Sequence, residues 1–206
     1  VSNLLNYNNT MGVVRQARGE RGLMITLEDM GESPTLLNFR NGTYDLEKDT
    51  FRGHESTDYI FKTCNTDYVP DQEATLWDRV IKEIFDGDTQ LIAYVQRLMG
   101  YSVSGDTSDP IFNIFHGDGA NGKSTLVGTI SGLLGEYSRD LPSELFDKNK
   151  DLHPTYLATL RGARLAVVAE MASDVHLAEA TIKKVTSSDM IEARRMREDP
   201  WSFKPT

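Results

Sequence analysis

A loop of eight residues combines glycines, a lysine and a hydroxyl at a spacing suited to phosphate binding. It reads Gly117-Asp118-Gly119-Ala120-Asn121-Gly122-Lys123-Ser124 and matches the pattern G-x-x-x-x-G-K-[ST]. Glycines let the backbone curl so that successive N–H groups face inward, and a helix that follows adds its positive end to the same anion. The loop therefore predicts a site for the phosphates of a nucleoside triphosphate, for which ATP with Mg²⁺ is the simplest choice.

Individual side chains of the loop have separate expected tasks. Lys123 carries a mobile charge for the β and γ phosphates, and the Ser124 hydroxyl is a ligand for Mg²⁺. Thr125 follows and is expected at the α and β phosphates. The alternative is a chance match in a glycine-rich turn. The flanks argue against chance, because the apolar run 111–115 predicts a buried strand before the loop and 125–134 predicts a helix after it.

A carboxylate that could complete this site follows a second apolar run. Five apolar residues, 165–169, precede Glu170, which places the acid at the C-terminal edge of a predicted strand, where open α/β sheets bind ligands. A phosphate loop needs such a group to hold Mg²⁺ or to orient the attacking water. Lys123 and Glu170 are therefore the predicted catalytic pair, with Ser124 and Glu170 as the metal ligands. The alternative is an exposed glutamate after a buried strand.

The residues before the loop predict a small domain with a hairpin and two helices. Asn41-Gly42 is a favourable pair for a tight turn and separates the extended runs 36–40 and 43–46. Apolar residues then recur at helical spacing from Trp77 to Phe85, and Asp88 can cap a second helix that carries Leu91 to Met99.

Turn residues mark the expected boundaries between regions. Residues 1–35 are polar with many glycines and are interpreted as the tail of an upstream region. Residues 36–105 form the predicted helical and hairpin domain, and 106–206 form the predicted P-loop core. The fold class expected is therefore α/β, with parallel strands in a core that the chain contains only in part.

Composition excludes several classes of protein. With 31 acidic and 22 basic residues among 206, the net charge is −9, which argues against nonspecific coating of nucleic acid by bulk charge. One cysteine, Cys64, fits a reducing compartment, and the four histidines lack the spacing of a zinc site. No apolar run reaches the length of a bilayer span, so no membrane partner is expected. These features predict a cytoplasmic protein, and the family resemblance described in the next paragraph implies a bacterial host or a virus-infected cell.

Several segments together resemble the phage, plasmid and poxvirus primase-helicase family, whose motor belongs to helicase superfamily 3 and is AAA+-like. The resemblance covers residues 36–206 and is weak in the first 35. The segments that carry it are Leu36-Leu37-Asn38-Phe39-Arg40-Asn41-Gly42-Thr43-Tyr44-Asp45-Leu46, Leu98-Met99-Gly100-Tyr101 with Gly105-Asp106, Gly119-Ala120-Asn121-Gly122-Lys123-Ser124-Thr125, and Ile191-Glu192-Ala193-Arg194-Arg195 with Asp199-Pro200.

This resemblance implies a DNA-dependent ATPase that forms a homo-oligomeric ring, usually a hexamer, and draws a single DNA strand through its centre during replication. Some members also carry an upstream primase domain. In the family a sensor asparagine and an arginine that reaches the neighbouring subunit follow the point at which this chain ends. We therefore expect this piece alone to hydrolyse ATP weakly.

The resemblance also assigns a strand-gripping segment after Glu170. Five cations fall within fifteen residues there, and the expected DNA contacts are Lys183, Lys184, Arg194 and Arg195. A solvated helix face is the alternative for each. The chain departs from the family in two respects. Glycines are absent near Ser187, and a single acid stands where two are common, so that either Glu170 serves both the metal and the water or Asp174 assists it.

Two other functions remain compatible with the loop. A P-loop kinase would transfer phosphate to a small acceptor without stimulation by DNA. A nucleotide-dependent assembly module would bind ATP without turnover. DNA-stimulated hydrolysis by the parent protein, abolished by Lys123→Ala, separates the helicase from both.

Overall fold

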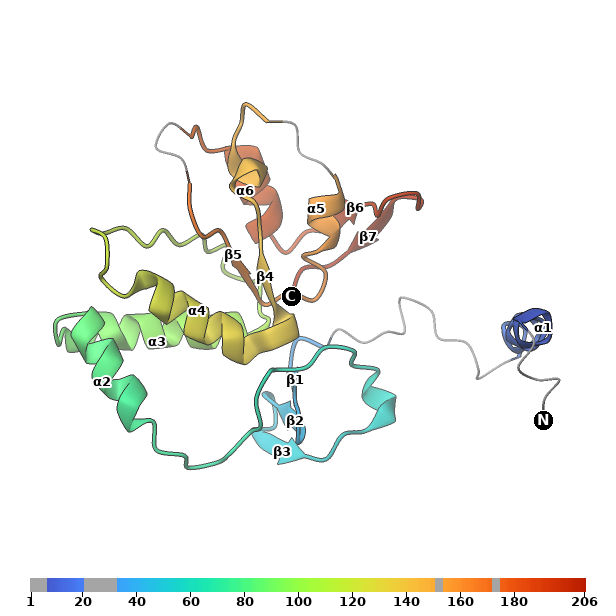
Figure 1. Ribbon diagram of the computed structural model, residues 1–206, viewed down its shortest axis with the longest axis horizontal. Coiled ribbons are helices and arrows are strands. Elements are labelled where there is room, and N and C mark those ends of the chain that lie inside the picture. Colours follow the sequence, from blue (N-terminus) through green and yellow to red (C-terminus); the bar gives the residue numbers. More distant parts are fainter. Residues whose placement is uncertain (1–6, 21–32, 151–153, 172–174) are drawn as a thin grey trace. The chain divides into compact units, whose positions relative to one another are not determined.

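The structure, a computed structural model, describes residues 7–20, 33–150, 154–171 and 175–206 (Figure 1). The chain divides into two compact units, one of residues 1–32 with 55–60 and one of residues 33–54 with 61–206. The described part of the first unit contains helix α1 (Tyr7–Ala17) and the short 3₁₀ helix η1 (Ser56–Asp58). All the predicted site residues lie in the second unit.

A three-stranded antiparallel sheet opens the second unit. Its strands are β1 (Leu36–Phe39), β2 (Gly42–Asp45) and β3 (Thr50–Arg52), in the order β1-β2-β3. The predicted hairpin is confirmed, but its turn is one residue earlier than expected. Phe39 pairs with Gly42, so the two turn residues are Arg40 and Asn41.

Gly42 is needed for close packing and not for the turn conformation. A Cβ at this position would lie 2.5 Å from a ring carbon of Phe51 and 2.4 Å from the Arg52 carbonyl oxygen. The Phe51 ring comes from the neighbouring strand, which the local sequence pattern does not reveal. The glycine was therefore correctly singled out for the hairpin, but for the wrong physical reason.

Two helices follow, as the helical spacing predicts. They are α2 (Thr75–Ile84) and α3 (Thr89–Ser104). Asp88 caps α3, because its carboxylate accepts hydrogen bonds from the backbone N–H groups of Gln90 and Leu91, each 3.0 Å away. Gly105 ends α3 in the left-handed conformation, with φ of 67°.

The remaining elements mix helices with short strands. In chain order they are α4 (Lys123–Leu134), η2 (Gly135–Tyr137), β4 (Ser138–Asp140), η3 (Ser143–Phe146), α5 (Pro154–Ala158), β5 (Leu165–Val167), α6 (Glu179–Thr186), β6 (Ile191–Ala193) and β7 (Trp201–Phe203). β4 and β5 pair in parallel, whereas β6 and β7 form an antiparallel hairpin. Helix α4 packs against β4 and β5. The described fold is thus mixed α/β, with one parallel pair of strands.

The strand predicted at residues 111–115 is not formed in the part of the chain that the structure describes. Ile111 to Ile114 are exposed, and Ile114 is 70% accessible, so this segment is not covered on both faces. An apolar run becomes a buried strand only when other strands pair with it, and no described strand does so. The Phe112 ring instead lies 5.7 Å from the ring of Phe146.

Among the described residues of the second unit, buried side chains form two hydrophobic cores. One contains Leu37, Cys64, Leu134 and Tyr137, so it joins β1 to the end of α4 and includes residues from both sides of position 105. The other surrounds the β6–β7 hairpin and contains Leu141, Leu145, Phe146, Leu157, Ala158, Leu160, Ile191, Ala193 and Phe203. Across the described residues, every helix is too short or too polar to cross a membrane.

Candidate functional site

The loop 117–122 leads directly into helix α4, which begins at Lys123. Gly122 is the N-cap of this helix and has φ of 83°, a left-handed conformation that glycine adopts at low cost. Ala120 also has a positive φ, 59°, although it carries a Cβ. A non-glycine residue in this region stores strain of about 1–3 kcal/mol, and such strain is concentrated at functional sites.

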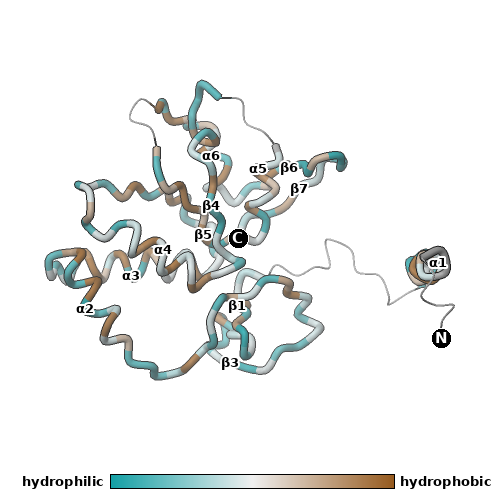
Figure 2. Tube along the Cα trace, viewed as in Figure 1, coloured by the Kyte–Doolittle hydropathy of each residue, from teal (hydrophilic) through white to brown (hydrophobic). Residues whose placement is uncertain are grey.

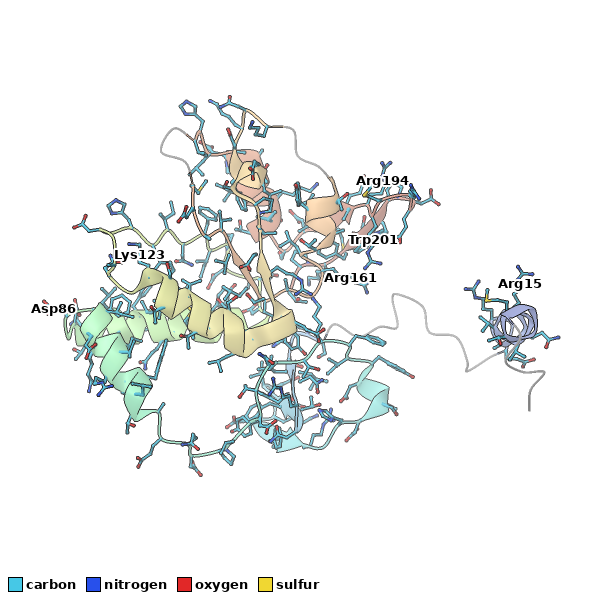
Figure 3. The ribbon with its side chains drawn as sticks, viewed as in Figure 1. Arg15, Asp86, Lys123, Arg161, Arg194 and Trp201 are labelled. Atoms are coloured by element: carbon cyan, nitrogen blue, oxygen red, sulfur yellow. The ribbon has the colours of Figure 1, made fainter. Side chains whose placement is uncertain are left out.

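Lys123 turns back over the loop from which it emerges (Figure 3). Its ammonium donates to the carbonyl oxygens of Gly117 at 2.8 Å and Asp118 at 3.0 Å, and to Oδ1 of Asn121 at 2.7 Å. Three oxygens thus surround one positive charge at the loop surface. Phosphate oxygens could replace them without any movement of the helix backbone, because the lysine side chain has four rotatable bonds.

The first turn of α4 presents further groups that suit an anion. Ser124 and Thr125 are exposed, so both hydroxyls are accessible to a ligand. The first N–H groups of any α-helix have no partner within the helix, and the helix dipole makes this end positive. Leu126, the next residue, is only 1% exposed, and its buried side chain anchors the first turn of α4. The helix start is therefore fixed by a buried leucine, while its polar groups face outward.

Glu170 lies three residues beyond the last residue of β5. The strand is shorter than predicted and ends at Val167, so Glu170 follows it in a segment without regular secondary structure and is exposed. Among the described residues, no hydrogen bond or ion pair connects Glu170 to the phosphate loop, and Asp174 lies outside those residues. The structure thus places Glu170 beyond the C-terminal end of a parallel strand, and its role with Mg²⁺ stays a prediction.

The predicted DNA-contacting cations occupy two different elements. Lys183 and Lys184 are exposed on α6, where the Lys183 ammonium lies 3.9 Å from the Glu179 carboxylate. Arg194 and Arg195 begin the turn between β6 and β7 and are also exposed. Side chains of α6 and of the β6–β7 hairpin share one hydrophobic core. Both elements therefore belong to the same part of the fold, although no described interaction joins the lysines to the arginines.

The hairpin turn brings together groups that the sequence analysis missed (Figure 3). Trp201 has two guanidinium carbons near its ring centroid, that of Arg161 at 5.4 Å and that of Arg195 at 5.8 Å. Both lie within the distance of a cation–π interaction. Figure 2 shows that the turn between β6 and β7 is mostly hydrophilic. A tryptophan two residues after Asp199, in a basic segment, was the sequence signal that could have indicated this cluster. The contact of Trp201 with Arg161 could not be inferred, because the two residues are distant in sequence.

Preformed metal clusters are absent from the described residues: no three His, Cys, Asp or Glu side chains gather there as a possible metal site. A Mg²⁺ ion bound through Ser124 and triphosphate oxygens would not require such a cluster, because Mg²⁺ is usually held by one or two protein groups together with substrate phosphates and water. A shallow depression on the α2 surface, lined by Asp78, Arg79 and Lys82 among others, is separate from the loop residues.

Comparison with known families identifies two matches along the chain. Residues 1–86 match the family described as D5 N terminal like. Residues 115–206 match a family of unknown function, DUF5906, and this range includes the phosphate loop and the β6–β7 hairpin.

Three viral proteins are similar to the chain and are named as helicase candidates. L207/L206 of Acanthamoeba polyphaga mimivirus is 27% identical over 96% of this chain. Protein 184R of Invertebrate iridescent virus 6 is 29% identical over 83%, and 121R of Invertebrate iridescent virus 3 is 28% identical over 80%. The chain spans only 22%, 18% and 18% of these relatives, respectively, or about a fifth of their length.

The D5-like match and the viral relatives support the resemblance that the sequence segments indicate. The D5-like match includes the β1–β2 hairpin, the DUF5906 match includes the loop 117–124, and the mimivirus relative aligns over 96% of the chain. The comparisons therefore confirm the resemblance of this chain to the phage and virus primase-helicase family.

Proposed function

We propose that this chain is the nucleotide-binding part of a replicative DNA helicase that acts in virus-infected or phage-infected cells. The loop 117–124 binds the triphosphate of ATP, with Lys123 at the β and γ phosphates and Thr125 at the α and β phosphates. Ser124 and Glu170 hold Mg²⁺, and Glu170 orients the attacking water. In the whole protein the site works within a homo-oligomeric ring, which we expect to be a hexamer.

One observation carries the nucleotide part of this proposal. The residue after the left-handed Gly122 begins α4, and its ammonium lies within 3.0 Å of three oxygens around the loop. A cation held by several weak oxygen partners at a helix N-terminus favours an anion that offers stronger ones. The exposed hydroxyls of Ser124 and Thr125 provide the groups that a bound Mg²⁺ and the phosphates need.

A second observation favours single-stranded DNA as the partner of the hairpin turn. Proteins that bind single strands without sequence preference combine cations for the backbone with aromatic or guanidinium planes for the bases. Arg194, Arg195 and Arg197 supply the cations, and Trp201 with Arg161 supplies stacked planes. Lys183 and Lys184 on α6 extend the basic surface, although Glu179 partly offsets the charge of Lys183.

The nucleotide site is tested by Lys123→Ala, with Lys148→Ala as a matched exposed control. Calorimetric titration with Mg·ATP should show binding to the wild type and to the control. The loop variant should bind at least about tenfold more weakly, which corresponds to about 1.4 kcal/mol. Equal affinity of both variants would overturn the assignment of the loop.

The motor function is tested in the full-length protein. DNA-stimulated ATP hydrolysis that disappears in the Lys123→Ala variant supports the helicase. Hydrolysis that is indifferent to DNA favours a kinase, and binding without turnover favours an assembly module.

The DNA surface is tested by the double variant Arg194→Ala/Arg195→Ala and by Lys183→Ala/Lys184→Ala. Each lost phosphate contact should reduce the slope of log K against log salt by about 0.7 for a single strand. Mg·ATP affinity should stay unchanged in both variants. An unchanged slope in either pair would assign those residues to an ordinary solvated surface.

A further inference from the structure

The phosphate loop leads into the first residue of helix α4. Residues of the N-terminal region, here residues 33–54 and 61–86, contact both ends of this helix. Ile84, the last residue of α2, lies directly against Gly122. A Cβ added to Gly122 would lie 2.4 Å from Cγ1 and 2.9 Å from Cδ1 of Ile84. The side chain of Ile84 thus occupies the space beneath the N-cap of α4, where the loop changes into helix.

The other end of α4 is held by the segment Lys62–Asn65 of the same region. The N–H of Asn65 donates to the Leu133 carbonyl at 2.9 Å, and the N–H of Glu136 donates to the Thr63 carbonyl at 3.2 Å. The Glu136 carboxylate also accepts from the N–H of Thr63 at 2.9 Å. These reciprocal bonds fix both the position and the direction of the helix end.

A close approach of the two backbones confirms that this end has little freedom. A Cβ at Gly135 would lie 2.8 Å from the backbone nitrogen of Asn65 and 2.9 Å from the Thr63 carbonyl oxygen. The Tyr137 hydroxyl adds a bridge, since it accepts from the N–H of Asn38 and donates to the Lys62 carbonyl, each at 3.2 Å. Residues 62–65 are therefore packed against the end of α4 without room for an additional methyl group.

Arg164 connects the start of β5 to the N-terminal region and to the end of α3. Its guanidinium is buried, and it donates to the carbonyl oxygens of Ser33, Leu36 and Val103. It also lies 4.9 Å from the ring centroid of Tyr137. Burial lowers the pKa of the guanidinium, which nevertheless stays a cation because the ordinary pKa of arginine is far above neutral pH. The strand that leads to Glu170 thus begins at a fixed position relative to the N-terminal sheet.

We infer that the N-terminal region is a structural part of the nucleotide site, and that Ile84 is a positioning residue for the phosphate loop. Lys62–Asn65 and Ile84, here called the bracket, hold α4 at its two ends. Both lie within residues 1–86, which match a family separate from the one that contains the loop. The bracket fixes where Lys123 and the first N–H groups of α4 are directed, so that these groups are already oriented when phosphate arrives.

The bracket preorganises the phosphate loop for its ligand. Groups that must meet a ligand within about 0.5 Å need a supporting layer that locks them, and a site without such support binds weakly even when all its groups are present. Ile84 would not contact the bound triphosphate. It acts on the loop through its contact with the backbone of Gly122. This inference rests on the proposed function, in which the loop binds the triphosphate.

The test uses a graded series at Ile84, measured as Mg·ATP affinity and as thermal stability. Ile84→Val removes one methyl group, and Ile84→Ala removes three carbons beneath Gly122. Leu76→Ala is the control on the same helix, because Leu76 is 63% exposed. Affinity is measured well below the melting temperature of the least stable variant, so that every sample is folded.

We expect affinity to fall in the order wild type, Ile84→Val, Ile84→Ala, with a loss on the order of tenfold for the alanine variant. Leu76→Ala should bind as the wild type does. Unchanged affinity of folded Ile84→Ala, with only a lower melting temperature, would overturn the positioning role. If the wild type itself fails to bind Mg·ATP, the proposed function fails first, and this outcome is distinct from a failure of the inference.

Discussion

The two ends of helix α4 are built in opposite ways. At its C-terminal end, Leu134 and Tyr137 are each 4% exposed and belong to a core with β1 and Cys64. At its N-terminal end, the loop residues 117–121 are exposed, and Lys123 is surrounded mainly by oxygens of the loop itself. The anchored end is made of contacts between distant parts of the sequence, whereas the loop end is made almost entirely of local ones.

Under the proposed function, this difference separates stability from ligand binding within one helix. Substitutions at the anchored end should lower the free energy of unfolding, because they remove buried contacts. Substitutions of exposed loop groups should change ligand binding with little effect on stability. Ile84 and Gly122 are the exception, since they join the loop end to the buried interior.

The largest effect on stability should follow Leu134→Ala at the anchored end. Removing this buried side chain from a core should cost about 2–5 kcal/mol of unfolding free energy, as measured by urea denaturation. Its neighbour Leu133 is 48% exposed, so Leu133→Ala should change stability by about 0.5 kcal/mol or less. Similar losses for both variants would show that the end of α4 is not anchored as described.

An intermediate effect should follow Gly122→Ala at the loop end. The new methyl group would lie 2.4 Å from Ile84 Cγ1 in a backbone with φ of 83°, so strain and overpacking act together. Overpacking alone typically costs about 1–3 kcal/mol. Gly119→Ala is the control, because a Cβ there meets nothing within 4 Å. The expected result is a lower melting temperature for Gly122→Ala only, and equal melting temperatures would contradict the contact with Ile84.

How much the sequence alone reveals follows the same division between local and distant contacts. The helix that follows the loop and the Asp88 cap depend on neighbouring residues and were both predicted, although α4 begins at Lys123 and not at residue 125. The strand at 111–115 was predicted wrongly, because pairing requires a partner strand that no local pattern specifies. Ile84 beneath Gly122, and Arg161 beside Trp201, are contacts across 38 and 40 residues of sequence, respectively, and therefore could not be predicted.

Cys64 shows how little chemical accessibility the anchored end of α4 has. Burial raises the pKa of the Cys64 thiol to about 11, so little of the reactive thiolate is present near neutral pH. Cys64 belongs to the anchored core and is 2% exposed. It is thus best understood as a small buried side chain, and its environment gives it no role at the loop.

The smallest effect should be a pH-dependent one in the sheet that anchors α4. Asp45, at the end of β2, accepts hydrogen bonds from the Lys48 ammonium at 2.9 Å and from the N–H groups of Glu47 and Lys48. These bonds, that of the ammonium foremost, hold the carboxyl pKa below its ordinary value of 3.8. Because the folded state favours the charged form, this contribution to stability is complete above the unfolded-state pKa and is lost as the pH falls through the lower folded-state pKa.

Asp45→Asn should therefore lower the melting temperature at pH 6 to 7 by a small amount, and the gap from the wild type should narrow as the pH falls below about 4. Thermal unfolding followed by circular dichroism across this range measures the gap. Asp67→Asn, at an exposed position, should show no such pH dependence. A gap that widens in acid would mean that the charged carboxylate destabilises the sheet. The Asp45–Lys48 pair would then add nothing to the stability of the sheet that anchors α4, and the anchored end would depend on its apolar core and its hydrogen bonds to residues 62–65.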